Sequence, residues 1–291
     1  MSRNVPRDRT LIQEGQGWNG RYDVRTDAVC VYGVDDTLPA RVASWRARGY
    51  RVYLMTGLAW GHYQDFLLGR WDGRDHWDDA QRHADGKPKL HGPDMPYIAP
   101  SRAYGVYLGA LLKQAIAAGV EAIFLEEPEF WAYTGYGPGF ERAWQTRYGA
   151  PYRDPATNAL TFTQSSALKY ALYTDLIAYL CEVVKRETVS RPGGAIPCYV
   201  ATHSLLNYAH NRIVSPVSVL QGIANCDGVI LQVWSHTARG QVVYEGWRGE
   251  RIFAVAFLEY GSGLEIARGT GLDLWFLADP VEDSPLYGWD R

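Results

Sequence analysis

Short apolar runs alternate with longer amphipathic segments along this 291-residue chain. The apolar runs have the length of buried strands, and turn residues follow most of them. Eight runs are expected to be strands: residues 10–14, 28–33, 51–56, 122–126, 196–202, 228–234, 252–259 and 272–277. Helices are expected over residues 39–48, 102–118, 139–148, 163–188, 216–224 and 262–270. This alternation predicts a parallel sheet whose strands are joined by helices.

Eight such strands predict an α/β fold of the (β/α)8 barrel type, in one domain over residues 1–291. Residues 58–100 are polar and aromatic without a clear period, and an insertion of that length is expected to be a lid or binding loop. The chain ends about a dozen residues after the eighth run. We therefore expect the closing helix of the barrel to be missing, or to belong to a longer protein of which this chain is a fragment.

The fourth expected strand ends in three glutamates, Glu126, Glu127 and Glu129. Catalytic side chains of a barrel come from the carboxyl ends of its strands. Side chains alternate along a strand, so Glu126 and Glu127 are not both expected to point into the barrel mouth. Pro128 favours an extended backbone at Glu127, which is therefore predicted to stay at the rim as the general acid and base. Burial beside other carboxylates raises the pKa of a carboxyl group as that role requires.

The seventh expected strand ends in Glu259, which is predicted to be the nucleophile. Two carboxyl groups that flank the scissile bond are what glycoside hydrolysis requires. A separation of roughly 5 Å between Glu127 and Glu259 predicts retention of configuration, and roughly 6.5–9.5 Å predicts inversion. The alternative for both glutamates is structural, as strand-end acids that cap a helix or pair with an arginine.

The motifs at residues 125–129 and 257–259 resemble the clan of retaining glycoside hydrolases that have (β/α)8 barrels and two catalytic glutamates. This resemblance implies that Glu127 is the acid/base and Glu259 the nucleophile. In that clan an asparagine that binds the substrate 2-hydroxyl commonly precedes the acid/base, and here Glu126 stands in its place. The chain is also similar to bacterial proteins described as glycoside-hydrolase-like, which imply no particular substrate.

Composition favours a neutral or weakly charged carbohydrate as the ligand. The chain has 11 Trp and 20 Tyr, whose flat faces suit sugar rings, and its net charge of -3 argues against nucleic-acid binding. Further polar and aromatic residues lie at expected strand ends or in the insertion. The predicted substrate-binding residues are Glu126, Glu129, Trp60, His62, His203, Gln232, Trp234, His236, Tyr260, Trp275 and Asp279.

No metal or cofactor site is predicted. The histidines and aspartates of the insertion lack the spacing of zinc-protease and calcium-loop motifs, and no dinucleotide, P-loop or nucleophile-elbow motif occurs. The four cysteines are widely spaced and are expected to be buried free thiols. Without a signal peptide or an apolar segment of about 20 residues, the chain is expected to be cytoplasmic and to have no membrane partner.

Two alternatives to a glycoside hydrolase remain open from the sequence. One is a barrel that binds carbohydrate without catalysis, as part of a larger protein. The other is a metal-assisted lyase or isomerase. That second alternative requires His203, Glu127 and another carboxylate to converge on one point at roughly 2.0–2.2 Å.

Overall fold

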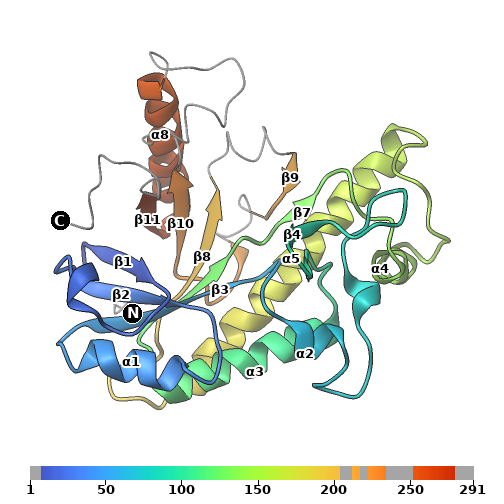
Figure 1. Ribbon diagram of the computed structural model, residues 1–291. Helices are drawn as coiled ribbons and strands as arrows, with labels where there is room; N and C mark the ends of the chain where they lie inside the picture. Colours follow the sequence, from blue (N-terminus) through green and yellow to red (C-terminus); the bar gives the residue numbers. More distant parts are fainter. Residues whose placement is uncertain (1–7, 204–211, 217–221, 234–251, 279–291) are drawn as a thin grey trace.

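Seven parallel strands form the central sheet of the computed structural model (Figure 1). The structure describes residues 8–203, 212–216, 222–233 and 252–278. All neighbouring strands pair in parallel, so their carboxyl ends lie at one edge of the sheet. In spatial order the strands are β1 (Leu11–Glu14), β2 (Ala28–Tyr32), β3 (Arg51–Gly57), β6 (Ile123–Glu126), β8 (Cys198–His203), β10 (Gly228–Val233) and β11 (Asp273–Ala278).

Four helices return the chain between strands of the sheet and cover one of its faces, here called the outer face (Figure 1). Local sequence features set their ends. The hydroxyl of Ser101 accepts a hydrogen bond from the Tyr104 N–H, and Gly119 adopts a left-handed φ of 98° at the end of the same helix. The helices are α1 (Leu38–Arg46), α3 (Arg102–Ala118), α5 (Ala159–Thr188) and α8 (Ile252–Thr270).

Each face of the sheet carries its own apolar core because successive side chains point to opposite faces. The core of the outer face includes Val52, Leu54, Ile123, Leu125 and Val200. The core of the other face, here called the inner face, includes Tyr53, Met55, Phe124, Tyr199, Ala201 and Ile230. The period of two therefore puts the strand-end residues Glu126, His203 and Gln232 on the inner face.

The sheet is an open half-barrel and not the expected closed barrel. Residues 252–259 are the first part of α8, which continues through the expected helix as one segment of 19 residues. A continuous apolar run has no period that separates a buried strand from a buried helix, and no helix-breaking proline interrupts this one. Within the described ranges β1 and β11 remain the two edges of the sheet. The prediction of an α/β fold with a parallel sheet is confirmed, and that of a strand at residues 252–259 is wrong.

The insertion between β3 and α3, expected to be a lid or binding loop, packs part of its length into the protein core. Tyr63, Phe66, Leu67 and Ile98 are buried in the outer-face core. The insertion contains α2 (Gln64–Leu67), η2 (Trp77–Asp79), β4 (Leu90–Gly92) and β5 (Met95–Pro96). Outside it, the smaller elements are η1 (Gly20–Tyr22), β7 (Phe130–Trp131), α4 (Pro138–Tyr148) and β9 (Ile213–Val214).

Within the described ranges, no helix is both long and apolar enough to span a lipid bilayer. The expected helix at residues 216–224 lies largely outside the described residues. All four cysteines are buried and free, which confirms the prediction for them.

Candidate active site

The carboxyl ends of β6, β8 and β10 bring three polar side chains to the inner face. Glu126 pairs in register with Ala201, and His203 pairs with Gln232. The phenol of Tyr32, at the end of β2, donates a 2.5 Å hydrogen bond to Glu126 Oε2. Glu126 is thus fixed at the mouth of the half-barrel by a residue that lies two strands away in the sheet.

Glu127 also reaches the inner face, although strand alternation predicts that it should not. Its backbone is left-handed, with φ of 51°, and not extended as the following proline led us to expect. The Glu127 N–H donates to Ala201 O at 2.7 Å, so the pairing with β8 holds this backbone in place. Such a conformation costs a non-glycine residue on the order of 1 kcal/mol or more and is often found at functional sites.

The carboxylate of Glu127 is held from two sides. Its Oε2 accepts a hydrogen bond from the indole N–H of Trp60, and its Oε1 accepts one from the Gln232 side-chain amide at 3.3 Å. Trp60 comes from the insertion and Gln232 from the end of β10. The two donors fix the orientation of a carboxylate that is only 8% exposed.

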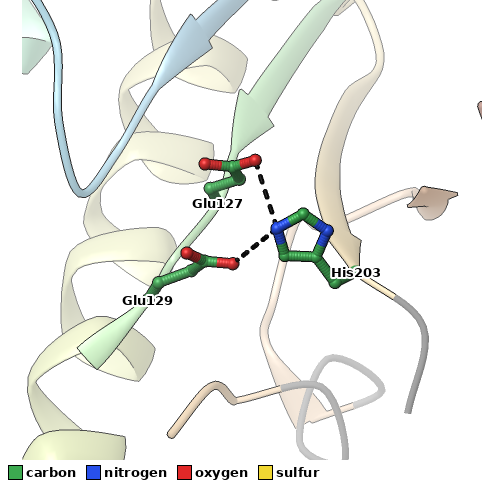
Figure 2. Close-up of side chains that lie close together, drawn as sticks. All are labelled: Glu127, Glu129 and His203. Atoms are coloured by element: carbon green, nitrogen blue, oxygen red, sulfur yellow. Dashed lines mark ion pairs between the residues drawn. The ribbon is translucent and has the colours of Figure 1, made fainter. Parts of the chain in front are cut away.

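His203 lies between two carboxylates (Figure 2). Its Nε2 is 3.3 Å from Glu127 Oε1 and 3.0 Å from Glu129 Oε1. Glu129 is 1% exposed, and its Oε1 forms an ion pair with the His203 ring. Three ionisable groups from β8 and the segment after β6 therefore meet in a nearly dry environment.

The charges of this cluster move its pKa values in different directions. Burial, aided by the charge of Glu127, raises the pKa of Glu126 to about 8. Burial also acts to raise the pKa of Glu127, but the hydrogen bond and charge of His203 and the bond from Trp60 outweigh it, so the pKa is lowered. Burial and the Glu127 charge raise the pKa of Glu129 to about 7.

The imidazole of His203 is held as a cation. Its burial favours the neutral ring, but the charges of Glu129 and Glu127 outweigh that effect and raise its pKa well above the usual value. At neutral pH the site therefore combines a protonated Glu126 carboxyl group with an ionised Glu127. The sequence predicted a raised pKa for Glu127, and the structure transfers that property to Glu126.

An aromatic wall borders the carboxylates. The Trp60 indole stacks on the His91 ring with centroids 3.6 Å apart, and the Tyr32 ring lies 6.3 Å from Trp60. Tyr97 contacts both the His91 ring and Trp131 edge-on. Flat rings next to polar groups are the usual lining of a sugar-binding site.

Five of the predicted substrate-binding residues come together with Glu127 in this site. They are Trp60, Glu126, Glu129, His203 and Gln232. Tyr32 and His91 also lie in this site, although neither is among the predicted site residues. Tyr32 could have been predicted from the sequence, because it has a polar hydroxyl group and lies at the end of an apolar run. His91 could not have been, since it reaches Trp60 only through the fold of the insertion.

Other predicted residues lie elsewhere. Tyr260 is on α8, where its ring packs against Phe276, and His62 is exposed. Trp275 is on the inner face, where it pairs with Ile230 and so lies two residues further from the carboxyl edge of the sheet than Gln232. There it lines a cavity of about 300 Å³. The remaining three, Trp234, His236 and Asp279, lie outside the described residues.

Glu259 does not arrive at the mouth on a strand, as its predicted role as nucleophile required. It lies in α8 and is fully buried. One turn further along, an added Cβ at Gly263 would be 2.4 Å from Leu231 and 3.0 Å from Phe276, so this face of the helix packs on the outer face of the sheet. Glu259 is on the helix layer, whereas Glu126 and Gln232 are on the inner face. The structural basis for pairing Glu259 with Glu127 is therefore lost.

No protein-family model matches the sequence, and a search of curated proteins gives no match. Several solved structures are similar to this chain over most of its length. Ega3 of Aspergillus fumigatus, in complex with galactosamine, is 9% identical with a TM-score of 0.47 over 92% of this chain and 76% of that chain. The glycoside hydrolase domain of PelA from Pseudomonas aeruginosa is 10% identical with a TM-score of 0.47, over 92% and 82%.

The α-galactosidase TtGalA of Thermus thermophilus, in complex with p-nitrophenyl α-D-galactopyranoside, is 12% identical. Its TM-score is 0.45, over 93% of this chain and 58% of that chain. The identities and TM-scores of these three structures are too low to assign an activity, so the activity has to be inferred from the side chains of the site.

Proposed function

We propose that this protein is a glycoside hydrolase that acts on a neutral or weakly charged carbohydrate, with Glu126 as general acid and Glu127 as the ionised carboxylate. The observation that carries this proposal is the pair of adjacent carboxyl groups at the carboxyl edge of the sheet, each held by hydrogen bonds from other elements. Burial raises the pKa of Glu126, whereas the contacts of Glu127 with His203 and Trp60 lower that of Glu127. Such a divided pair is the usual sign of an acid and a base that work together. Its place at the carboxyl edge of a parallel sheet, beside the aromatic wall, supports the same function.

In this mechanism each group has a defined task. Glu126 gives its proton to the glycosidic oxygen as the bond to the anomeric carbon breaks, and the Glu127 carboxylate stabilises the positive charge that develops on the sugar. Water then adds to the anomeric carbon, and its proton returns to Glu126. The hydrogen bond from Tyr32 orients Glu126, while Trp60 and Gln232 hold Glu127.

The test compares glycosides with good and poor leaving groups. A 2,4-dinitrophenyl glycoside needs no proton to leave, whereas an alkyl glycoside does. Glu126→Gln should therefore lower kcat on alkyl glycosides by about 10²- to 10⁴-fold and have much less effect on dinitrophenyl glycosides. Glu127→Gln should lower kcat on both substrates alike.

The matched control is Glu141→Gln, which changes an exposed glutamate on α4. Glu259→Gln is expected to leave the kcat of folded protein within a few-fold of the original, because α8 lies on the outer face. A screen of aryl glycosides and oligosaccharides selects the substrate first. If Glu126→Gln and Glu127→Gln both retain full turnover on that substrate, the proposed hydrolysis by this pair is refuted.

A further inference from the structure

Glu127, Glu129 and His203 present three metal-ligating atoms to a common point (Figure 2). These atoms all lie within 4.8 Å of one another, and the three residues are buried. Around a cation with bonds of about 2.0–2.2 Å, neighbouring ligand atoms are about 3.0–3.5 Å apart. The separations of 3.0 and 3.3 Å from His203 Nε2 to the two carboxylates already have these values. Two edges of a coordination polyhedron therefore exist without any movement of side chains.

The Glu129 carboxylate supplies a second, independent observation. Its Oε1 is buried, faces His203 in Figure 2, and apart from that ion pair accepts no hydrogen bond from the described residues. A buried carboxylate has lost its hydration and needs a positive charge or hydrogen-bond donors beside it, and here the imidazolium of His203 alone fills that role among the described residues. A divalent cation bound between the two groups would replace the proton of His203 and bring a larger charge to this oxygen.

The surroundings also have the form of an outer coordination sphere. Ligating carboxylates are commonly held by hydrogen bonds from residues behind them. Here the Trp60 indole N–H binds Glu127 Oε2, the oxygen that does not face His203, and so fixes the direction of Oε1. The Gln232 amide adds a second restraint at 3.3 Å.

We propose that Glu127, Glu129 and His203 form a binding site for one divalent transition-metal cation of the Zn²⁺ or Mn²⁺ type. One imidazole nitrogen with two carboxylate oxygens suits these ions, whereas Ca²⁺ and Mg²⁺ prefer ligands that are all oxygen. On binding, His203 Nε2 exchanges its proton for the metal, and the proton passes to solvent. The site is measured without a carbohydrate, so it stands or falls separately from the proposed hydrolysis.

The experiment titrates metal-stripped protein with Zn²⁺ by calorimetry in two buffers that differ in ionisation enthalpy, and with Mn²⁺ by electron paramagnetic resonance. One ion should bind per chain, Zn²⁺ should displace Mn²⁺, and proton release should accompany binding below the pKa of His203. Glu129→Gln and His203→Ala should each weaken binding by at least about 100-fold. The matched controls are Glu141→Gln and His83→Ala, which should bind as tightly as the original protein.

Thermal unfolding of the unmodified protein gives a readout that needs no variant. Zn²⁺ should raise its Tm in proportion to the logarithm of metal concentration, and Ca²⁺ at the same concentration should not. The proposal is overturned if the unmodified protein binds neither Zn²⁺ nor Mn²⁺ at millimolar concentration. Equal binding by Glu129→Gln, His203→Ala and the controls would also overturn it, since the ion would then be bound elsewhere.

Discussion

Replacing Glu126 with glutamine should remove a large part of the pH dependence of stability between pH 4.5 and 8. Burial and the neighbouring Glu127 charge raise the pKa of Glu126 from 4.5 to about 8 in the folded protein. In the unfolded chain the same group loses its proton near its ordinary value. Between these two values the folded state binds more protons than the unfolded state, so the free energy of unfolding falls as pH rises.

The size of this effect follows from the displacement of the pKa. At about 1.4 kcal/mol per pH unit, raising the pKa of Glu126 from 4.5 to about 8 corresponds to a loss on the order of 5 kcal/mol across that range. Glutamine resembles the protonated acid and keeps an oxygen that accepts the Tyr32 hydrogen bond. The variant and the original protein should therefore be similarly stable near pH 4.5, and the variant should be the more stable near pH 8.

Urea denaturation followed by tryptophan fluorescence, at several pH values from 4.5 to 8.5, measures this difference. Glu141→Gln, an exposed change of the same chemistry, should give a curve parallel to that of the original protein. The titrations of His203 and Glu129 are present in all three proteins, so the difference between curves reports mainly on Glu126. Parallel curves for Glu126→Gln and the original protein would refute the electrostatic account of this site.

Three further predictions concern Trp60, Lys169 and the cysteines. Trp60→Phe removes a charge-assisted hydrogen bond to Glu127 worth about 1.5–3 kcal/mol, so the pKa of Glu127 should rise. The acidic limb of the pH–rate profile should then move to higher pH by about 1–2 pH units, and an unmoved limb would contradict this. Burial lowers the pKa of Lys169 from 10.5 to about 7. Between these pH values the unfolded chain binds more protons than the folded protein, so the free energy of unfolding rises with pH there. Lys169→Met should therefore raise the Tm at pH 6.5 more than at pH 9.5, and an equal change at both pH values would count against this. The four cysteines should react with a thiol reagent only after denaturation, whereas rapid labelling of native protein would show that they are accessible.

Much of the sheet was predictable because its central strands are buried on both faces. Such strands are continuous apolar runs bounded by turn residues, and seven of the eight expected runs are strands of the sheet. The remaining run, the seventh along the chain at residues 252–259, is equally apolar but helical. Because the predicted role of Glu259 depended on its place at the end of a strand, the helix at these residues leaves that role without structural support.

The sequence by itself determined that glutamates would stand at the carboxyl end of β6, and it identified His203 and Gln232 at the ends of their strands. Strand length and the period of two carry that information, because they act between near neighbours in the chain. Only the tertiary structure decided which glutamate is protonated. The left-handed turn at Glu127 brings that residue to His203, Trp60 and Gln232, and so its carboxylate is ionised while Glu126 is not. The pKa of each carboxyl group depends on burial and on charges that lie far away in sequence, and these exist only once the chain has folded.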